Sequence, residues 1–136
     1  MSTDRSALIR DLEAAFAGLL FISENDAPFA LVDAPGAPFA ALDDEQVRRL
    51  AGRPSTDAVA TVPVKDFFRN AVRDQEWHGP AEKAAAKRYR ELVSLIESAL
   101  PDAKVFRIGA RRIAVLVVGT GPGGGTLGLS TTVVET

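Results

Sequence analysis

Apolar residues recur at helical spacing between Pro80 and Pro101, and this pattern predicts the longest helix of the chain. Proline suits the first helical position, so Pro80 marks the start, and the helix ends before Pro101. The predicted buried stripe consists of Ala85, Tyr89, Leu92, Val93, Ile96 and Leu100. The charged residues between them lie mostly on the solvent-facing side.

Three other segments have helical patterns. Leu8, Leu12, Phe16 and Leu19 carry the pattern of the first. This first helix is predicted over residues 4–20. A second, over residues 43–51, is opened by Asp43 or Asp44, and a short third covers residues 65–72.

After Pro101 the pattern changes to the period of β-strands. Residues 104–109 alternate, and Ile113 to Val118 are uniformly apolar, which is typical of a central strand covered on both faces. Leu127 to Val134 form a final strand. The short connections between these segments predict an antiparallel meander.

Two weaker strands are predicted at residues 29–32 and 59–64, and Pro63 makes the second an edge strand or ends it there. Polar, proline and glycine residues predict loops at 21–28, 33–38 and 73–79. We therefore expect one α/β domain over residues 1–136, a three-layer α/β/α sandwich with a mixed, mainly antiparallel sheet.

Composition narrows the possible functions. The 136 residues include no cysteine, which excludes disulfides and thiolate metal sites, and the net charge of −2 does not favour a nucleic-acid binder. We expect no signal peptide, and no apolar run approaches the ~20 residues of a membrane span. A cytoplasmic protein with no membrane association is the expectation.

Residues 119–124 match the G-x-G-x-x-G pattern of dinucleotide-binding loops. That mechanism needs a helix after the glycines, whereas a strand is predicted here. An ordinary hairpin loop is favoured over a small phosphate-binding loop at Gly119–Gly125.

The sequence contains few candidate catalytic side chains. His78 is the only histidine, and no spacing of carboxylates around it predicts a metal site. We therefore expect no enzyme activity, no catalytic residue and no cofactor.

Acidic residues gather in the predicted loops. Glu24 and Asp26 lie in the first loop, and Asp74 and Glu76 lie beside Trp77 in another. A charge cluster is usually only solvated surface, and a loop tryptophan can fold back on the core. A tryptophan in a polar loop is also typical of an interface anchor, which favours a protein-binding surface.

Five segments, in order along the chain, carry a family resemblance. They are Gly18-Leu19-Leu20-Phe21-Ile22-Ser23-Glu24 with Pro28-Phe29, Phe67-Phe68 with Asp74-Gln75-Glu76-Trp77, Tyr89 to Leu100, Val105 to Gly109, and Gly128 to Thr136. Together they resemble the nuclease A inhibitor family over nearly the whole chain. The resemblance implies an α/β/α sandwich and a bacterial inhibitor of a magnesium-dependent, DNA/RNA-nonspecific endonuclease.

The resemblance also implies roles for individual residues. Glu24 matches a glutamate that enters the nuclease active site, and Glu76 with Trp77 match an acidic-aromatic pair on the same surface. Thr136 matches a C-terminal threonine that reaches the catalytic metal of the nuclease, with Glu135 beside it. The implied partner is the nuclease, bound by a monomer in a 1:1 complex without direct contact to nucleic acid. An interaction module of the same fold with a non-nuclease partner is the alternative.

Overall fold

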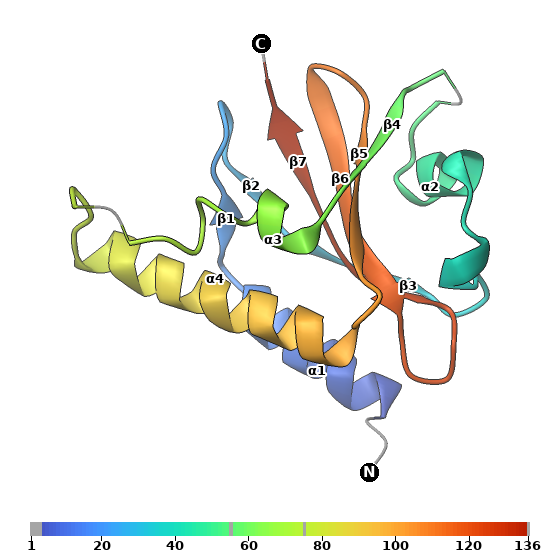
Figure 1. The fold of residues 1–136 in the computed structure, drawn as a ribbon, viewed down its shortest axis with the longest axis horizontal. Helices are drawn as coiled ribbons and strands as arrows, with labels where there is room; N and C mark the ends of the chain where they lie inside the picture. Colours follow the sequence, from blue (N-terminus) through green and yellow to red (C-terminus); the bar gives the residue numbers. More distant parts are fainter. Residues whose placement is uncertain (1–3, 55, 75, 136) are drawn as a thin grey trace.

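Five strands form one sheet in the order β3-β7-β6-β5-β4 (Figure 1). The computed structural model describes residues 4–54, 56–74 and 76–135. The strands are β3 (Ala30–Ala34), β4 (Val59–Val62), β5 (Lys104–Ile108), β6 (Arg112–Thr120) and β7 (Thr126–Val134). No parallel pair occurs among the described strands, so the sheet is antiparallel and not mixed as predicted.

The predicted central strand is confirmed: β6 is the middle strand of the sheet, with two strands on each side of it. Val115 and Val117 pack into the larger core on one face, and Leu116 and Val118 pack into a smaller core on the other. All four side chains are buried. A strand covered on both faces has no need of polar alternation, which explains the uniform apolar run.

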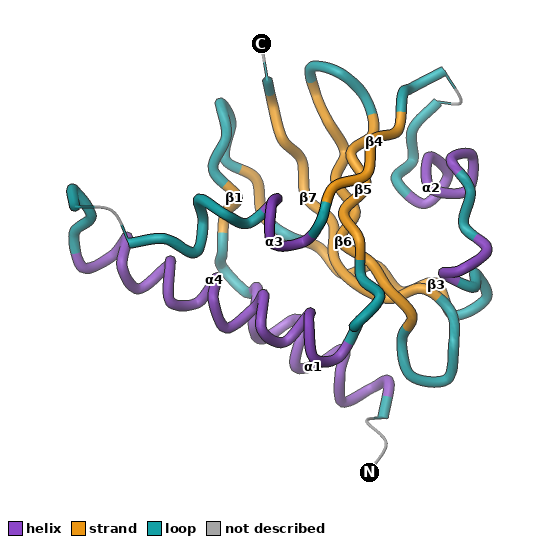
Figure 2. The backbone as a smooth tube through the Cα atoms, in the orientation of Figure 1, coloured by secondary structure: helices purple, strands orange, loops and turns teal. Residues whose placement is uncertain are grey.

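Helices lie on both sides of the sheet, and the prediction of a mixed α/β fold is confirmed (Figure 2). Helices α1 (Arg5–Phe16) and α4 (Pro80–Ala99) form the larger core with one face. The short helices η1 (Phe39–Ala41) and α2 (Asp44–Leu50) contribute Phe39 and Val47 to the smaller core.

Local signals explain where two of the helices begin. Pro80 is the first residue of α4, as predicted. Asp43 caps α2: its carboxylate accepts from the Gln46 amide at 2.8 Å, and the Gln46 side chain accepts from the Asp43 amide at 3.2 Å. This reciprocal capping box satisfies two amides that a helix start leaves unpaired.

Residues 17–28 differ from the prediction. Helix α1 ends at Phe16, not at residue 20, because Gly18 takes a φ of +75° and turns the chain away. The predicted loop at 21–28 contains two short paired strands, β1 (Leu20–Phe21) and β2 (Ala27–Pro28). Apolar contacts of Phe21, described below, hold this ribbon, and a local sequence pattern does not reveal them.

Strand β3 also runs further than predicted, into the expected turn at 33–38. Asp33 pairs with Leu127 and Ala34 with Thr126, because β7 offers backbone partners beyond the apolar run. The predicted strand at 59–64 is confirmed as the edge strand β4, and Pro63 follows its last residue. The predicted helix at 65–72 is only one turn, α3 (Val64–Phe67).

The glycine segment is a hairpin loop between β6 and β7, as predicted. The Arg5 guanidinium donates to the carbonyl oxygens of Pro122 and Gly124 at 3.2 and 2.7 Å, and to Asp33 at 2.8 Å. The loop therefore turns carbonyl oxygens toward a cation of α1. A phosphate-binding loop would instead present its amides to an anion.

Membrane spans and metal sites were sought in residues 4–54, 56–74 and 76–135. Within them, none of the helices combines the length and apolar character needed to cross a membrane. The same residues contain no group of three or more His, Cys, Asp or Glu side chains placed to hold a metal ion.

Gly123 and Gly125 provide a matched test of the loop. Both have positive φ, at 82° and 79°, so alanine at either site costs about 1 kcal/mol in backbone strain. A Cβ at position 123 meets open space, whereas one at position 125 lies 2.5 Å from the Pro35 carbonyl oxygen. We expect Gly125→Ala to lower the free energy of unfolding in urea by about 1–3 kcal/mol more than Gly123→Ala. Equal losses would show that Pro35 moves aside.

Candidate functional site

A groove of about 860 Å³ opens at the end of the sheet where β7 ends. It lies between β1 with its following turn, α3, the start of α4 and the end of β7 (Figure 1). Its lining includes Leu20, Phe21, Ile22, Ser23, Glu24, Asp66, Phe67, Trp77, His78, Ala81, Glu82, Ala85, Tyr89, Arg107, Val133, Val134 and Glu135. Segments from both ends of the chain therefore meet at one surface.

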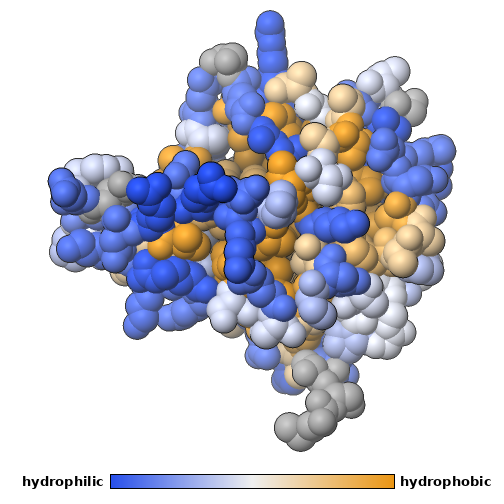
Figure 3. Space-filling view, in the orientation of Figure 1, coloured by the Kyte–Doolittle hydropathy of each residue, from blue (hydrophilic) through white to orange (hydrophobic). Residues whose placement is uncertain are grey.

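Three large apolar side chains of the groove are exposed to solvent. The exposed fraction is 78% for Ile22, 75% for Trp77 and 48% for Leu20. Figure 3 shows apolar surface reaching the outside among hydrophilic side chains on this face. Large apolar side chains gathered at one exposed site are characteristic of a protein-binding surface.

Aromatic rings support the groove from beneath. Phe21 of β1 stacks on Phe67 of α3 with ring centroids 4.5 Å apart and an interplanar angle of 8°. Phe21 also meets Phe29 and Phe68 edge-on, at 6.3 and 6.1 Å. Such contacts stabilise beyond the area they bury, by about 0.5–1.5 kcal/mol each.

Tyr89 of α4 connects this cluster to the ribbon. Its ring packs against Phe29 and Phe68, and its hydroxyl donates to the Leu20 carbonyl oxygen at 2.5 Å. Burial raises the pKa of Tyr89 well above its usual value, the negative charge of Asp26 raises it further, and Arg88 opposes both. The hydroxyl thus stays protonated and keeps donating at any physiological pH.

The turn after β1 is bonded to the end of β7. The Val134 amide donates to Ser23 Oγ at 3.1 Å, and the Glu24 amide donates to the Val134 carbonyl oxygen at 3.4 Å. Ser23 Oγ in turn donates to the Asn25 carbonyl oxygen at 2.9 Å. These bonds place Glu24 next to the last described residues.

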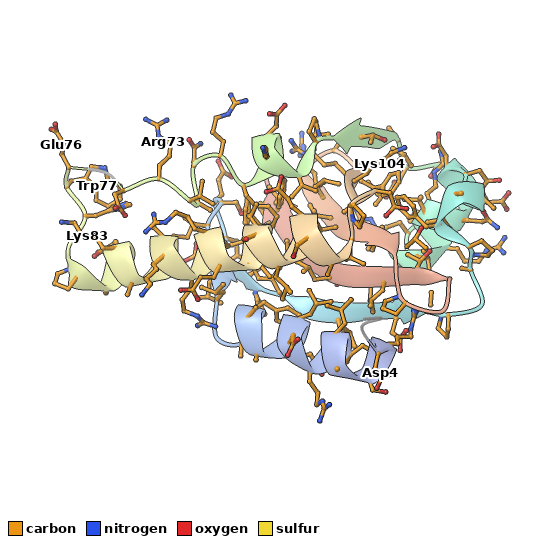
Figure 4. All side chains as sticks on the ribbon, turned by 60° about the horizontal axis from the view of Figure 1, so that its bottom comes forward. Asp4, Arg73, Glu76, Trp77, Lys83 and Lys104 are labelled. Atoms are coloured by element: carbon orange, nitrogen blue, oxygen red, sulfur yellow. The ribbon has the colours of Figure 1, made fainter. Side chains whose placement is uncertain are left out.

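Of the residues predicted from sequence, Glu24, Trp77 and Glu135 all line the groove. Figure 4 shows Trp77 directed back from the loop tip over the start of α4, whereas Glu76 points away. The Glu135 carboxylate forms an ion pair with Arg107. The structure thus brings three of the predicted residues to one place.

The remaining predicted residues lie outside the groove lining. Asp26 is exposed in the β1–β2 turn, and Glu76 is exposed at the loop tip. Asp74 is 3.5 Å from the Arg90 guanidinium, so its charge is partly balanced. Thr136 lies outside the described residues, and its predicted role stays a prediction.

His78 lines the groove, with its ring edge-on to Trp77 at 4.3 Å. The Gly119–Gly125 loop contributes nothing to the lining and lies at the other end of β6 and β7 (Figure 1). His78 and the glycine loop, the two sequence features considered for small-molecule chemistry, therefore do not form one site.

Sequence reasoning missed four residues of this site: Leu20, Ile22, Ser23 and Arg107. An apolar residue inside the predicted loop at 21–28 was a usable signal for Ile22, whereas Leu20 falls at the end of the first predicted helix. Arg107 falls on the same face of its strand as the buried Val105. A charged residue on the core-facing side of a strand indicates the edge of the core, because a charge taken out of water needs a polar partner.

Comparison with known protein families gives one match. A family model described as nuclease A inhibitor-like protein matches residues 6–136. No curated protein matches the chain. The matched range includes every groove residue named above.

Tyr89→Phe tests the link between the aromatic cluster and the ribbon. At pH 7 we expect it to lower the free energy of unfolding by about 0.5–1.5 kcal/mol, because the Leu20 carbonyl oxygen loses its donor. The raised pKa favours the protonated form in the folded state. Wild-type stability should therefore fall as the pH rises above about 10, by up to about 1.4 kcal/mol per pH unit, and the variant should lack this contribution.

Tyr89 is the only tyrosine, so tyrosinate absorbance measures its titration directly. The midpoint in the folded protein should lie clearly above 10. A midpoint near 10 would contradict both the burial effect and the pH dependence.

Proposed function

Because the chain belongs to the nuclease A inhibitor-like family, we propose that it is a protein inhibitor that occupies the active site of a nuclease. The observation that carries this proposal is the groove, which exposed Leu20, Ile22 and Trp77 line together with Glu24. The partner is a magnesium-dependent, DNA/RNA-nonspecific endonuclease, bound by one monomer of the inhibitor.

Charge complementarity supports this partner. A nonspecific nuclease reads phosphates with basic side chains around a divalent ion, so its active site attracts anions. Glu24 is exposed at the tip of the β1–β2 turn and offers a carboxylate in place of a phosphate. Asp26, Asp74 and Glu76 are exposed outside the groove lining, and in this proposal their main effect is on the rate of association.

Trp77 is the proposed apolar anchor. Its ring is three-quarters exposed in the free protein, so burying it against a partner removes a large apolar area from water. Tryptophan is enriched among the residues that dominate binding energy at interfaces. Ile22 and Leu20 extend the same apolar surface.

The segment that ends at Thr136 enters the nuclease site in this proposal. Val134 is bonded to Ser23 and Glu24 of the β1–β2 turn, so Glu135 follows directly on a residue that is held beside Glu24. A threonine hydroxyl and a carboxylate are oxygen ligands of the kind magnesium prefers. Thr136 is therefore the candidate ligand for the partner's metal.

The chain itself supplies no catalysis and no cofactor in this proposal, and it acts as one cytoplasmic domain without membrane or nucleic-acid contact. The helices η1 and α2 are a thin third layer of an α/β/α sandwich, supported by the packing of Phe39 and Val47 on the second sheet face. The groove lies on the opposite face of the sheet from this layer.

Glu24→Gln tests the charge contact, and Glu45→Gln on α2 is the matched control because Glu45 is exposed and pairs with Arg49 one helical turn away. The probe is a purified DNA/RNA-nonspecific endonuclease cleaving fluorescent double-stranded DNA. Losing a buried interfacial charge contact costs about 2–5 kcal/mol, so Glu24→Gln should raise the inhibition constant at least about 30-fold. The control should change it less than twofold.

Equal effects of the two substitutions would place the interface elsewhere. If wild-type protein inhibits no such nuclease yet binds a different basic protein through Glu24 and Trp77, the fold serves a non-nuclease partner instead.

Extending the chain beyond Thr136 tests the terminal segment. A few appended residues should leave the melting temperature nearly unchanged, because the last pair of the β6–β7 ladder lies at Val134. Inhibition should fall strongly, because the added residues block the approach of Thr136 to the metal. Full inhibition by the extended protein would restrict the contact to Glu24 and Trp77.

A further inference from the structure

We propose that Arg107 is a positioning residue that holds Glu135 and so sets the direction of the segment at residues 134 and 135 before any partner binds. This inference rests on the proposed function, in which that segment enters the nuclease. It assigns Glu135 a role within its own chain, in addition to its place at the groove.

Arg107 reaches its partner across a strand. In the register of the sheet, Arg107 of β5 lies beside Val115 of β6, which lies beside Thr131 of β7. Glu135 falls two positions beyond Val133 on the same face of β7, the face that carries α1 and α4. The guanidinium of Arg107 bonds Glu135 Oε1, and the Arg107 side chain is only 30% exposed.

The backbone of the same segment is fixed independently. The Glu135 amide donates to the Arg111 carbonyl oxygen at 2.8 Å, and the Val134 amide donates to Ser23 Oγ at 3.1 Å. Bonds to the β5–β6 turn on one side and to the β1–β2 turn on the other thus hold residues 134 and 135. The last residues of a chain usually lack such contacts.

Holding these residues lowers the cost of binding. Ordering a rotamer-rich side chain at an interface costs affinity, and a segment already in its bound direction avoids that cost. The pairing also leaves the Glu135 charge largely balanced by Arg107, so this carboxylate contributes little as a free anion for a partner. The expected effect of losing the hold is roughly 3- to 10-fold in the inhibition constant.

A double-mutant cycle tests the proposal, using the same nuclease and DNA substrate. Arg107→Met and Glu135→Gln should each raise the inhibition constant roughly 3- to 10-fold, and the double variant should be no worse than either single variant. Arg107→Lys should recover part of the effect. Arg111→Met, which removes the same charge from the adjacent turn, should have little effect.

Additive effects of the two substitutions would show that each contacts the partner separately, and this would overturn the proposal. So would inhibition by Arg107→Met that equals the wild type. Melting temperatures within about 2 °C of each other would show that global stability is not the cause.

Amide hydrogen exchange in the free protein separates this inference from the proposed function. The Glu135 amide should exchange faster in Arg107→Met than in wild type, while the amides of β6 stay protected. Unchanged exchange at Glu135 would overturn the inference whatever the nuclease assay gives. If Glu135 exchanges faster in Arg107→Met but the wild-type protein inhibits no nuclease, Arg107 does hold Glu135 and the proposed function is rejected.

Discussion

The stacking of Phe21 on Phe67 determines where the groove lies. Two paired strands of two residues each cannot hold their own shape in water, so packing must place the β1–β2 ribbon. The rings of Phe29, Phe68 and Tyr89 complete that packing, and the Tyr89 hydroxyl fixes the backbone at Leu20. The exposed side chains of Leu20, Ile22 and Glu24 are therefore carried on the half-buried rings of Phe21 and Phe67, which rest on the buried rings of Phe29, Phe68 and Tyr89.

The same support extends to the end of β7. Ser23 and Glu24 bond Val134, and Arg107 bonds Glu135, so the ribbon, the sheet and the last described residues form one connected unit. Helix α4 is attached to it through Tyr89, and Arg88 also donates to the Ala14 and Ala15 carbonyl oxygens at the end of α1. A binding surface built on such a unit needs little rearrangement when a partner arrives.

The sequence predicts the parts of the fold that depend on local patterns. The apolar run of β6, the helix opened by Pro80 and the Asp43 cap of α2 are each determined by residues near one another in the chain. The ribbon β1–β2, the extension of β3 and the single turn of α3 depend on partners far away in sequence. At the site, Glu24 and Trp77 stand out as exposed charge and exposed ring. Arg107 and Ser23 do not, because their importance comes only from what they bond in three dimensions.

The pairing of β3 with β7 has a consequence for how the protein folds. Strands β5, β6 and β7 are neighbours in sequence, so short loops are enough to bring them together. Strand β3 and helix α1 cannot complete their packing until β7, which is far away in sequence, pairs with β3. Contacts of such long sequence separation slow folding, and the apolar face of α1 is exposed meanwhile. Until β3 pairs with β7, the apolar surfaces of β3 and α1 stay uncovered, so the partly folded chain is prone to association at this surface.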